Sequence, residues 1–296
     1  MKTRLGIFIT TLLLLPMAGI FLSGAQWGDL VTSSVPEINS VTATLRTTMM
    51  LAFYVVLINH TVKRLTGKSP IGGQRPYFIG VGIGSCVLGA LLSYLNLFVA
   101  TWSVPQDNSL LVQLLIYIPL FALLAPAVLI TRSLFGSFPG LLKALTFKVS
   151  FRAGNGETLA RILLPLALFG LLGGAAWPAK LYWLLWLSPL LLLISIQLLW
   201  HESTIFSGIK SGDWGRVICT ALSGILIGNL AIISYQNNAA LDINLPNIWV
   251  AQAGFIVFGL TCLQLADLIA EYWRGTSRTA LYTQKKKFPI PVVVKK

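Results

Sequence analysis

The chain has 296 residues, of which 55% are hydrophobic and 10% are charged, whereas about 25% of the residues in a soluble domain are charged. This composition excludes a soluble globular protein, and the lack of short alternating segments argues against a membrane β-barrel. The formal net charge of +13 is better explained by basic cytoplasmic loops than by nucleic-acid binding.

Eight segments approach the length of about 20 apolar residues that crosses a bilayer. The sequence therefore predicts an all-α, polytopic helical membrane protein with about eight transmembrane helices. The fifth span looks short, and we expect it to be little tilted or partly re-entrant. The predicted spans are Leu5–Ser23, Val41–Val62, Tyr77–Trp102, Leu110–Thr131, Ile162–Trp177, Leu181–Trp200, Val217–Tyr235 and Trp249–Tyr272.

The first span has a second interpretation. A basic start, an apolar stretch and the small residues Ser23, Gly24 and Ala25 are also typical of a cleavable signal peptide. Cleavage would remove one helix and leave the orientation of the others unchanged, so both interpretations stay open here.

The orientation follows from the lysines and arginines. With a cytoplasmic N-terminus, 20 of the 22 basic residues lie in cytoplasmic segments, and Arg46 and Lys180 are the two exceptions. Because basic residues are enriched in cytoplasmic loops, we predict a protein of the cytoplasmic (inner) membrane with both termini in the cytoplasm.

Reporter fusions test this topology. We expect fusions at Ser69 and at the C-terminus to report a cytoplasmic location, and a fusion at Asn108 to report an external one. An external location at Ser69 would contradict the orientation.

Two inner loops resemble each other. His60 to Arg75 reads HTVKRLTGKSPIGGQR, and His201 to Arg216 reads HESTIFSGIKSGDWGR. A similar offset places Ser85-x-x-x-Gly89 on Gly224-x-x-x-Gly228. This pattern predicts two tandem, parallel four-helix units (1–131 and 162–272), in which residues 41–131 and 182–272 superpose. The alternative is two similar loops of equal length.

The segment between these units, 132–161, is predicted to be a cytoplasmic linker that contains an amphipathic helix lying on the membrane. Its apolar face would contact membrane lipids, or a membrane or cytoplasmic protein partner. The basic tail, 273–296, would touch anionic head groups. The residues that share the apolar face are Phe138, Leu141, Leu142, Leu145 and Val149.

Small residues recur in the third and seventh spans, where glycines about one turn apart let helices approach closely. We therefore predict that these two spans form the central pair of the bundle. The predicted helix-packing residues are Gly80, Gly84, Gly89, Gly224 and Gly228.

The chain has two histidines, His60 and His201, and both follow spans that end at the cytoplasmic side. Three interpretations are open. The imidazoles could stabilise helix ends, form a pH-sensitive or anion-binding site, or ligate a b-type haem.

Acidic and amide side chains mark the last two spans. Gln264, Asp267 and Glu271 share one face of the eighth span, and an acid inside a span is a candidate functional residue. Asp267 is expected to face the bundle and to pair with Arg216 or Arg274. Asn229 is expected to bond another helix or to line a cavity.

The function is predicted from these polar residues, because no catalytic motif, metal-ligand run or phosphate loop is present. We predict transport or permease-like binding of a small or lipid-like ligand between the two units. The ligand-binding residues would be His60, His201, Asp267, Glu271 and Asn229. The alternatives are a non-catalytic anchor or assembly subunit of a larger complex, and a quinone- or haem-binding subunit; no other cofactor is expected.

Overall fold

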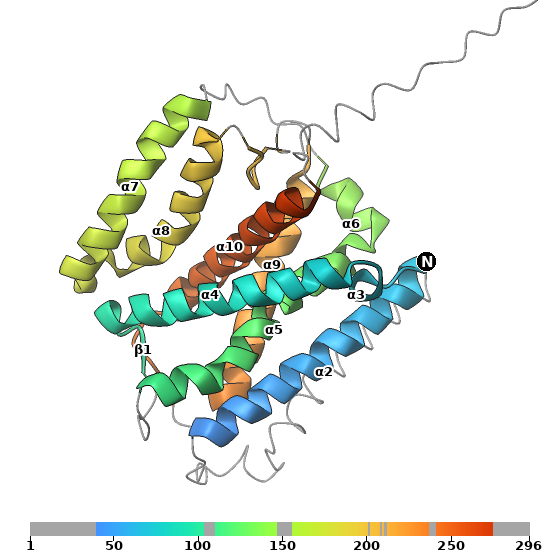
Figure 1. Ribbon diagram of the computed structural model, residues 1–296, viewed down its shortest axis with the longest axis horizontal. Helices are drawn as coiled ribbons and strands as arrows, with labels where there is room; N and C mark the ends of the chain where they lie inside the picture. The colour runs from blue at the N-terminus through green and yellow to red at the C-terminus, as the bar shows by residue number, and fades with distance from the viewer. Residues whose placement is uncertain are drawn as a thin grey trace, which may run out of the picture.

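Seven long helices make up most of the computed structural model, which describes residues 40–103, 110–146, 156–200, 202–207, 209, 212–236 and 241–274. Within these ranges, each of the seven is long and apolar enough to cross a membrane. The chain is therefore an all-α, multi-pass membrane protein (Figure 1). The helices are α2 (Ser40–Thr66), α4 (Arg75–Val99), α5 (Leu110–Gly136), α7 (Gly156–Ala176), α8 (Pro178–Leu199), α9 (Trp214–Gln236) and α10 (Ile248–Arg274).

Seven of the eight predicted spans are thus confirmed, and the first, Leu5–Ser23, lies outside the described residues. The prediction of a short fifth span is wrong, because α7 contains 21 residues. Its first turn is polar and was not counted as part of the span. Glu157 and Arg161 form an ion pair of 2.6 Å there, one turn apart on the helix.

The third span ends earlier than predicted. α4 stops at Val99, and Ala100 adopts the left-handed conformation with φ of 46°. The Asn96 carboxamide oxygen accepts hydrogen bonds from the backbone N–H groups of Thr101 at 3.0 Å and Trp102 at 3.3 Å. These bonds give partners to the backbone N–H groups of the residues that follow the helix end.

Trp102 consequently lies in a short strand, which the sequence did not predict. Strand β1 (Trp102–Ser103) pairs antiparallel with β2 (Asp242–Ile243). The Asn244 side chain adds a hydrogen bond of 3.2 Å to the Ala100 carbonyl. The pairing joins the connection after α4 to the connection after α9.

Two short helices lie at the opposite end of the bundle, α3 (Pro70–Gly73) and α6 (Pro139–Ala144). The predicted amphipathic helix is shorter than expected, because α6 ends at Ala144. Residues 147–155 lie outside the described part of the chain. Leu142 and Leu145 pack against Gly215 at the start of α9. We call this end of the bundle the inner end, and the end with β1 and β2 the outer end.

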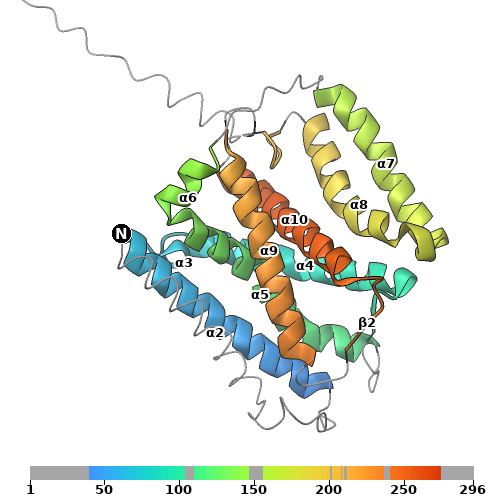
Figure 2. The ribbon, with the colours of Figure 1, turned by 180° about the vertical axis from the view of Figure 1, so that it is seen from behind.

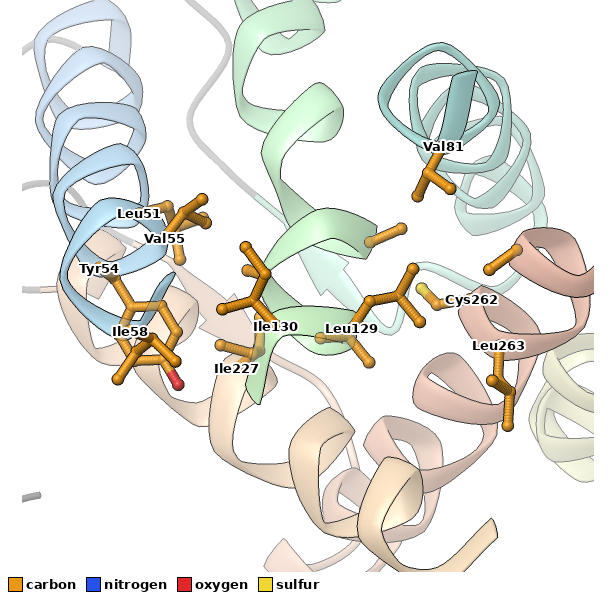
Figure 3. Close-up of a cluster of buried hydrophobic side chains, with 14 of the residues drawn as sticks. Leu51, Tyr54, Val55, Ile58, Val81, Leu129, Ile130, Ile227, Cys262 and Leu263 are labelled. Atoms are coloured by element: carbon orange, nitrogen blue, oxygen red, sulfur yellow. The ribbon is translucent and has the colours of Figure 1, made fainter. Parts of the chain in front are cut away.

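The centre of the bundle is formed by α5 and α10. Helix α5 contacts α2, α4, α9 and α10, and α10 contacts α4, α5, α8 and α9. Figure 3 shows Leu129 and Ile130 of α5 among buried residues of the neighbouring helices, with Tyr54 of α2 on one side and Val81 of α4 on another. The prediction that the third and seventh spans form the central pair is therefore wrong. Their small residues face α5 and α10 instead.

A serine of α4 supports the backbone of α5 near a proline. Pro126 lies inside α5, and proline interrupts the hydrogen bonds of a helix. The Ser85 hydroxyl accepts a bond of 3.0 Å from the Ala125 N–H and donates one of 2.5 Å to the Phe121 carbonyl. The hydroxyl thus bonds both the N–H and the carbonyl that form one i to i−4 pair of a regular α-helix.

Helices α7 and α8 form a hairpin at one edge of the molecule, as both views show (Figures 1 and 2). Gly170 and Gly174 lie so close to α8 that an added Cβ would overlap Ser188, Leu184 or Leu185. Close approach of this kind is how helices associate in lipid, where apolar surface alone gives no driving force. The hairpin touches the centre mainly through α8 on α10.

Candidate functional site

A cavity of about 760 Å³ lies in the outer half of the bundle. Its walls come from α4, α5, α8, α9 and α10, with one residue from α2, and the loops around β1 and β2 complete it. None of the described residues that line it carries a charge, and ten of them are aromatic. The most prominent of these rings belong to Trp102, Tyr117, Phe121, Trp186, Phe255 and Phe258.

Two glycines set the position of two of these rings. Gly89 of α4 lies against the Phe121 ring of α5, and Gly228 of α9 lies against the Phe255 ring of α10. A Cβ atom at either glycine would overlap the ring beside it. The glycines therefore let each ring lie flat on the neighbouring helix, and both rings line the cavity.

Two indole rings lie at the outer end of the cavity. The indole rings of Trp102 in β1 and Trp186 in α8 meet edge to face, with centroids 4.8 Å apart. This is a favourable arrangement for aromatic pairs. Together with the β1–β2 pairing, the two indoles form the outer part of the cavity wall.

Hydroxyl groups supply the polar contacts in its wall. The hydroxyls of Tyr117 in α5 and Tyr235 in α9 lie 3.1 Å apart in a hydrogen bond, and the Tyr117 ring stacks on Phe121 with centroids 5.7 Å apart. Thr47 of α2, which also lines the cavity, bonds Ser234 of α9 at 3.2 Å. Among the described residues, a ligand here would meet apolar side chains, hydroxyls and the Asn96 carboxamide, but no charged group.

A second group of polar residues lies at the inner end. Arg216, in the first turn of α9, forms an ion pair with Asp267 of α10. The side chains are 11% and 15% exposed. As the sequence predicted, Asp267 has a basic partner, and that partner is Arg216. A buried ion pair of this kind holds two helices together only while both charges are present.

Next to this ion pair, a non-helical segment is buried in the bundle. Ser203, Thr204 and Ile205 are all buried, and we call these three residues the inner plug. The Ile205 N–H donates a hydrogen bond of 3.0 Å to the side-chain carbonyl of Gln264, and the Gln264 amide donates to Gln197 of α8. Non-helical backbone at membrane depth needs such partners.

The structure brings together only part of the predicted ligand-binding set. Asp267 and Glu271 lie near one another on α10, both half-buried. His60 is exposed on α2, which packs on α5 and α9, and His201 lies outside the described residues. The structure therefore does not place His60 beside the acidic residues, and the ligand-binding role of all four residues stays a prediction.

Asn229 bonds another helix, in keeping with one of its two predicted roles. Its amide donates to the Gln252 side chain of α10 at 2.7 Å, and the Gln252 amide returns a bond of 3.0 Å. This reciprocal pair joins α9 to α10 next to the cavity. Among the glycines, Gly84 packs against Leu265 and Ile269 of α10, and Gly80 lies half-buried in α4.

The residues that line the cavity were missed by sequence reasoning. Trp102 was predicted to be the last residue of the third span, but it forms part of the cavity wall. Tyr117 and Trp186 lie in spans that are mostly apolar, so no change in periodicity marks them. The glycine of Ser85-x-x-x-Gly89 was the one available signal, because it adjoins Phe121.

Comparisons with known proteins add no assignment. No protein-family model matches the chain, and no curated protein and no solved structure matches it either. The functional conclusion therefore depends on the cavity and on the polar residues at the inner end.

Proposed function

We propose that this membrane protein is a permease-like carrier that binds an apolar, lipid-like ligand in the cavity between its two helical units. The observation that supports this most directly is the uncharged, aromatic wall around about 760 Å³. Binding cavities for small molecules have volumes of about 300–1,000 Å³ and are mostly apolar, with a few polar groups. A charged solute would lose its hydration here without gaining a partner.

The same cavity supports the proposal of a tandem repeat. Helices α4 and α5 meet through Gly89 and Phe121, and helices α9 and α10 meet through Gly228 and Phe255. The two pairs line one cavity, and β1, after α4, pairs with β2, after α9. In the proposed arrangement, the ligand lies between two equivalent units, with both termini in the cytoplasm.

The contacts at the inner end support a cavity that is closed on the side of the basic loops. The Arg216–Asp267 ion pair and the inner plug lie between the cavity and the basic loops. A carrier must close one side while the other is open, and these contacts supply that closure in the proposed cycle. Asp267 and Glu271 are the residues whose charge a coupling ion could change.

A space-filling substitution tests the binding site. A Cβ added at Gly254 of α10 meets nothing within 4 Å, and Gly254 lines the cavity. We expect Gly254→Leu to fold normally but to lose the apolar compound that co-purifies after mild detergent extraction. Solvent extraction followed by mass spectrometry measures the loss.

Gly136→Leu is the matched control. Gly136 also has nothing within 4 Å of an added Cβ, and it lies at the inner end of α5 outside the cavity. This control should keep the compound. Equal amounts of the same compound in the wild type and both variants would contradict binding in the cavity.

A further inference from the structure

Contacts between helices and loops lie at both ends of the cavity, and part of its side wall is exposed. Trp102 and Trp186 lie at the outer end, and the inner plug and the Arg216–Asp267 ion pair lie at the inner end. Several residues of the cavity wall are exposed, and the large ones lie on two helices: Tyr94 of α4 is 57% exposed, Leu97 of α4 is 56% exposed, and Trp183 of α8 is 53% exposed. The large exposed side chains of the wall therefore mark an accessible edge along α4 and α8.

This edge faces lipid rather than water. Tyr94 lies five residues before the end of α4, and Trp183 lies five residues after the start of α8. At about 1.5 Å per residue, both rings lie about 7–8 Å inside the outer ends of helices that cross the membrane. Tyrosine and tryptophan are enriched at that depth, where head groups meet hydrocarbon.

The chemistry of the wall selects the part of a lipid that enters. No described residue of the wall offers a charge to a head group, whereas rings such as Phe121, Phe255 and Phe258 offer dispersion contacts to a hydrocarbon chain. A lipid whose head group stays beside Tyr94 and Trp183 could place one chain among these rings. Because lipid tails are already apolar, packing against the rings rather than escape from water would favour this position.

We propose that the cavity takes one acyl chain of a membrane phospholipid through a lateral opening at Tyr94 and Trp183, between α4 and α8. The inference builds on the proposed function, since it names the ligand class and the route for the same cavity. The head group stays at the outer surface, and the chain reaches Phe258 in the wall.

Photo-crosslinking tests the ligand class. Benzoylphenylalanine replaces Phe258 in the full chain, which is placed in vesicles of phosphatidylethanolamine and phosphatidylglycerol and, separately, kept in native membranes. Irradiation should add the mass of one phospholipid in both settings. The same group at Phe169, a lipid-exposed position of α7, is the control for reactivity.

A pair of substitutions on α4 tests the route. Ala90 is an exposed residue of the cavity wall, so Ala90→Trp narrows the opening. Val87, one turn away, is exposed outside the cavity, so Val87→Trp is the matched control. We expect Ala90→Trp to abolish the adduct at position 258 and to leave the adduct at position 169 unchanged, and Val87→Trp to change neither.

The other outcomes distinguish the phospholipid inference from the proposed binding function. An adduct at position 258 in native membranes but not in the defined vesicles overturns the phospholipid assignment and leaves the proposed function standing. A phospholipid adduct that survives Ala90→Trp overturns the lateral route. An absence of any adduct at position 258 in both settings, with position 169 reactive, overturns the inference and the proposed binding function together.

Discussion

Replacing Arg216 by methionine, with Asp267 left in place, should lower the free energy of unfolding by about 3–5 kcal/mol, the usual effect of breaking a buried ion pair. The two side chains are only 11% and 15% exposed, so the remaining carboxylate would keep little of its hydration. Unfolding in detergent, followed by helical circular dichroism, measures the change.

A double substitution separates the charge from the packing. Arg216→Met together with Asp267→Leu removes both charges, and we expect it to recover most of the lost stability, since apolar pairs often replace buried ion pairs without loss. If the double variant is as unstable as Arg216→Met alone, the unpaired charge is not the cause of the lost stability.

Asp267→Asn then distinguishes a structural from a functional role. If the carboxylate serves ligand coupling, this variant keeps near-normal membrane levels and loses activity. If the carboxylate only holds α9 against α10, the protein level falls instead.

Gly224→Ala should destabilise the protein by about 1–3 kcal/mol or more, the range found when atoms are forced into a packed interior. Gly224 lies where α9 crosses α10, and an added Cβ would overlap the Phe255 carbonyl and come within 2.8 Å of the Gly259 Cα. These neighbours are backbone atoms, which cannot move aside as a flexible side chain can. Thermal unfolding in detergent measures the loss.

Gly254→Ala provides the comparison for this prediction. Gly254 lies five residues before Gly259 on the same helix, and an added Cβ there has open space. Alanine favours a helix over glycine by about 0.5–1 kcal/mol, so this variant should be at least as stable as the wild type. Equal stability of the two alanine variants would show that the crossing tolerates a methyl group.

The fold was largely predictable because the bilayer imposes simple requirements. A span must be apolar over about 20 residues and must satisfy its own backbone, so hydropathy alone located α2, α4, α5 and the later helices. The ends were harder to predict. The polar turn at Glu157 and the side-chain bonds of Asn96 that end α4 depend on individual contacts rather than on average hydropathy.

The candidate site was only partly predictable. Asp267 was found because a charge inside a span is costly, and Arg216 was one of two partners within reach. The cavity was not found, because six helices contribute its wall and each ring looks like an ordinary apolar residue of its span. The inner plug was missed for a related reason. Ser203 and Thr204 read as loop residues, and their burial follows from the hydrogen bond between Ile205 and Gln264.

The hydroxyl that Ser85 inserts into α5 has a mechanical consequence. Phe121 bonds this hydroxyl through its carbonyl and lines the cavity with its ring, and Pro126 follows one turn later. Helices bend most readily where proline or an inserted side chain interrupts the backbone bonds. We therefore expect a displacement of the Phe121 ring to bend α5 at the Ser85 bridge. Helix α5 packs against α2 and α9, so the bend would also move its inner half relative to these helices.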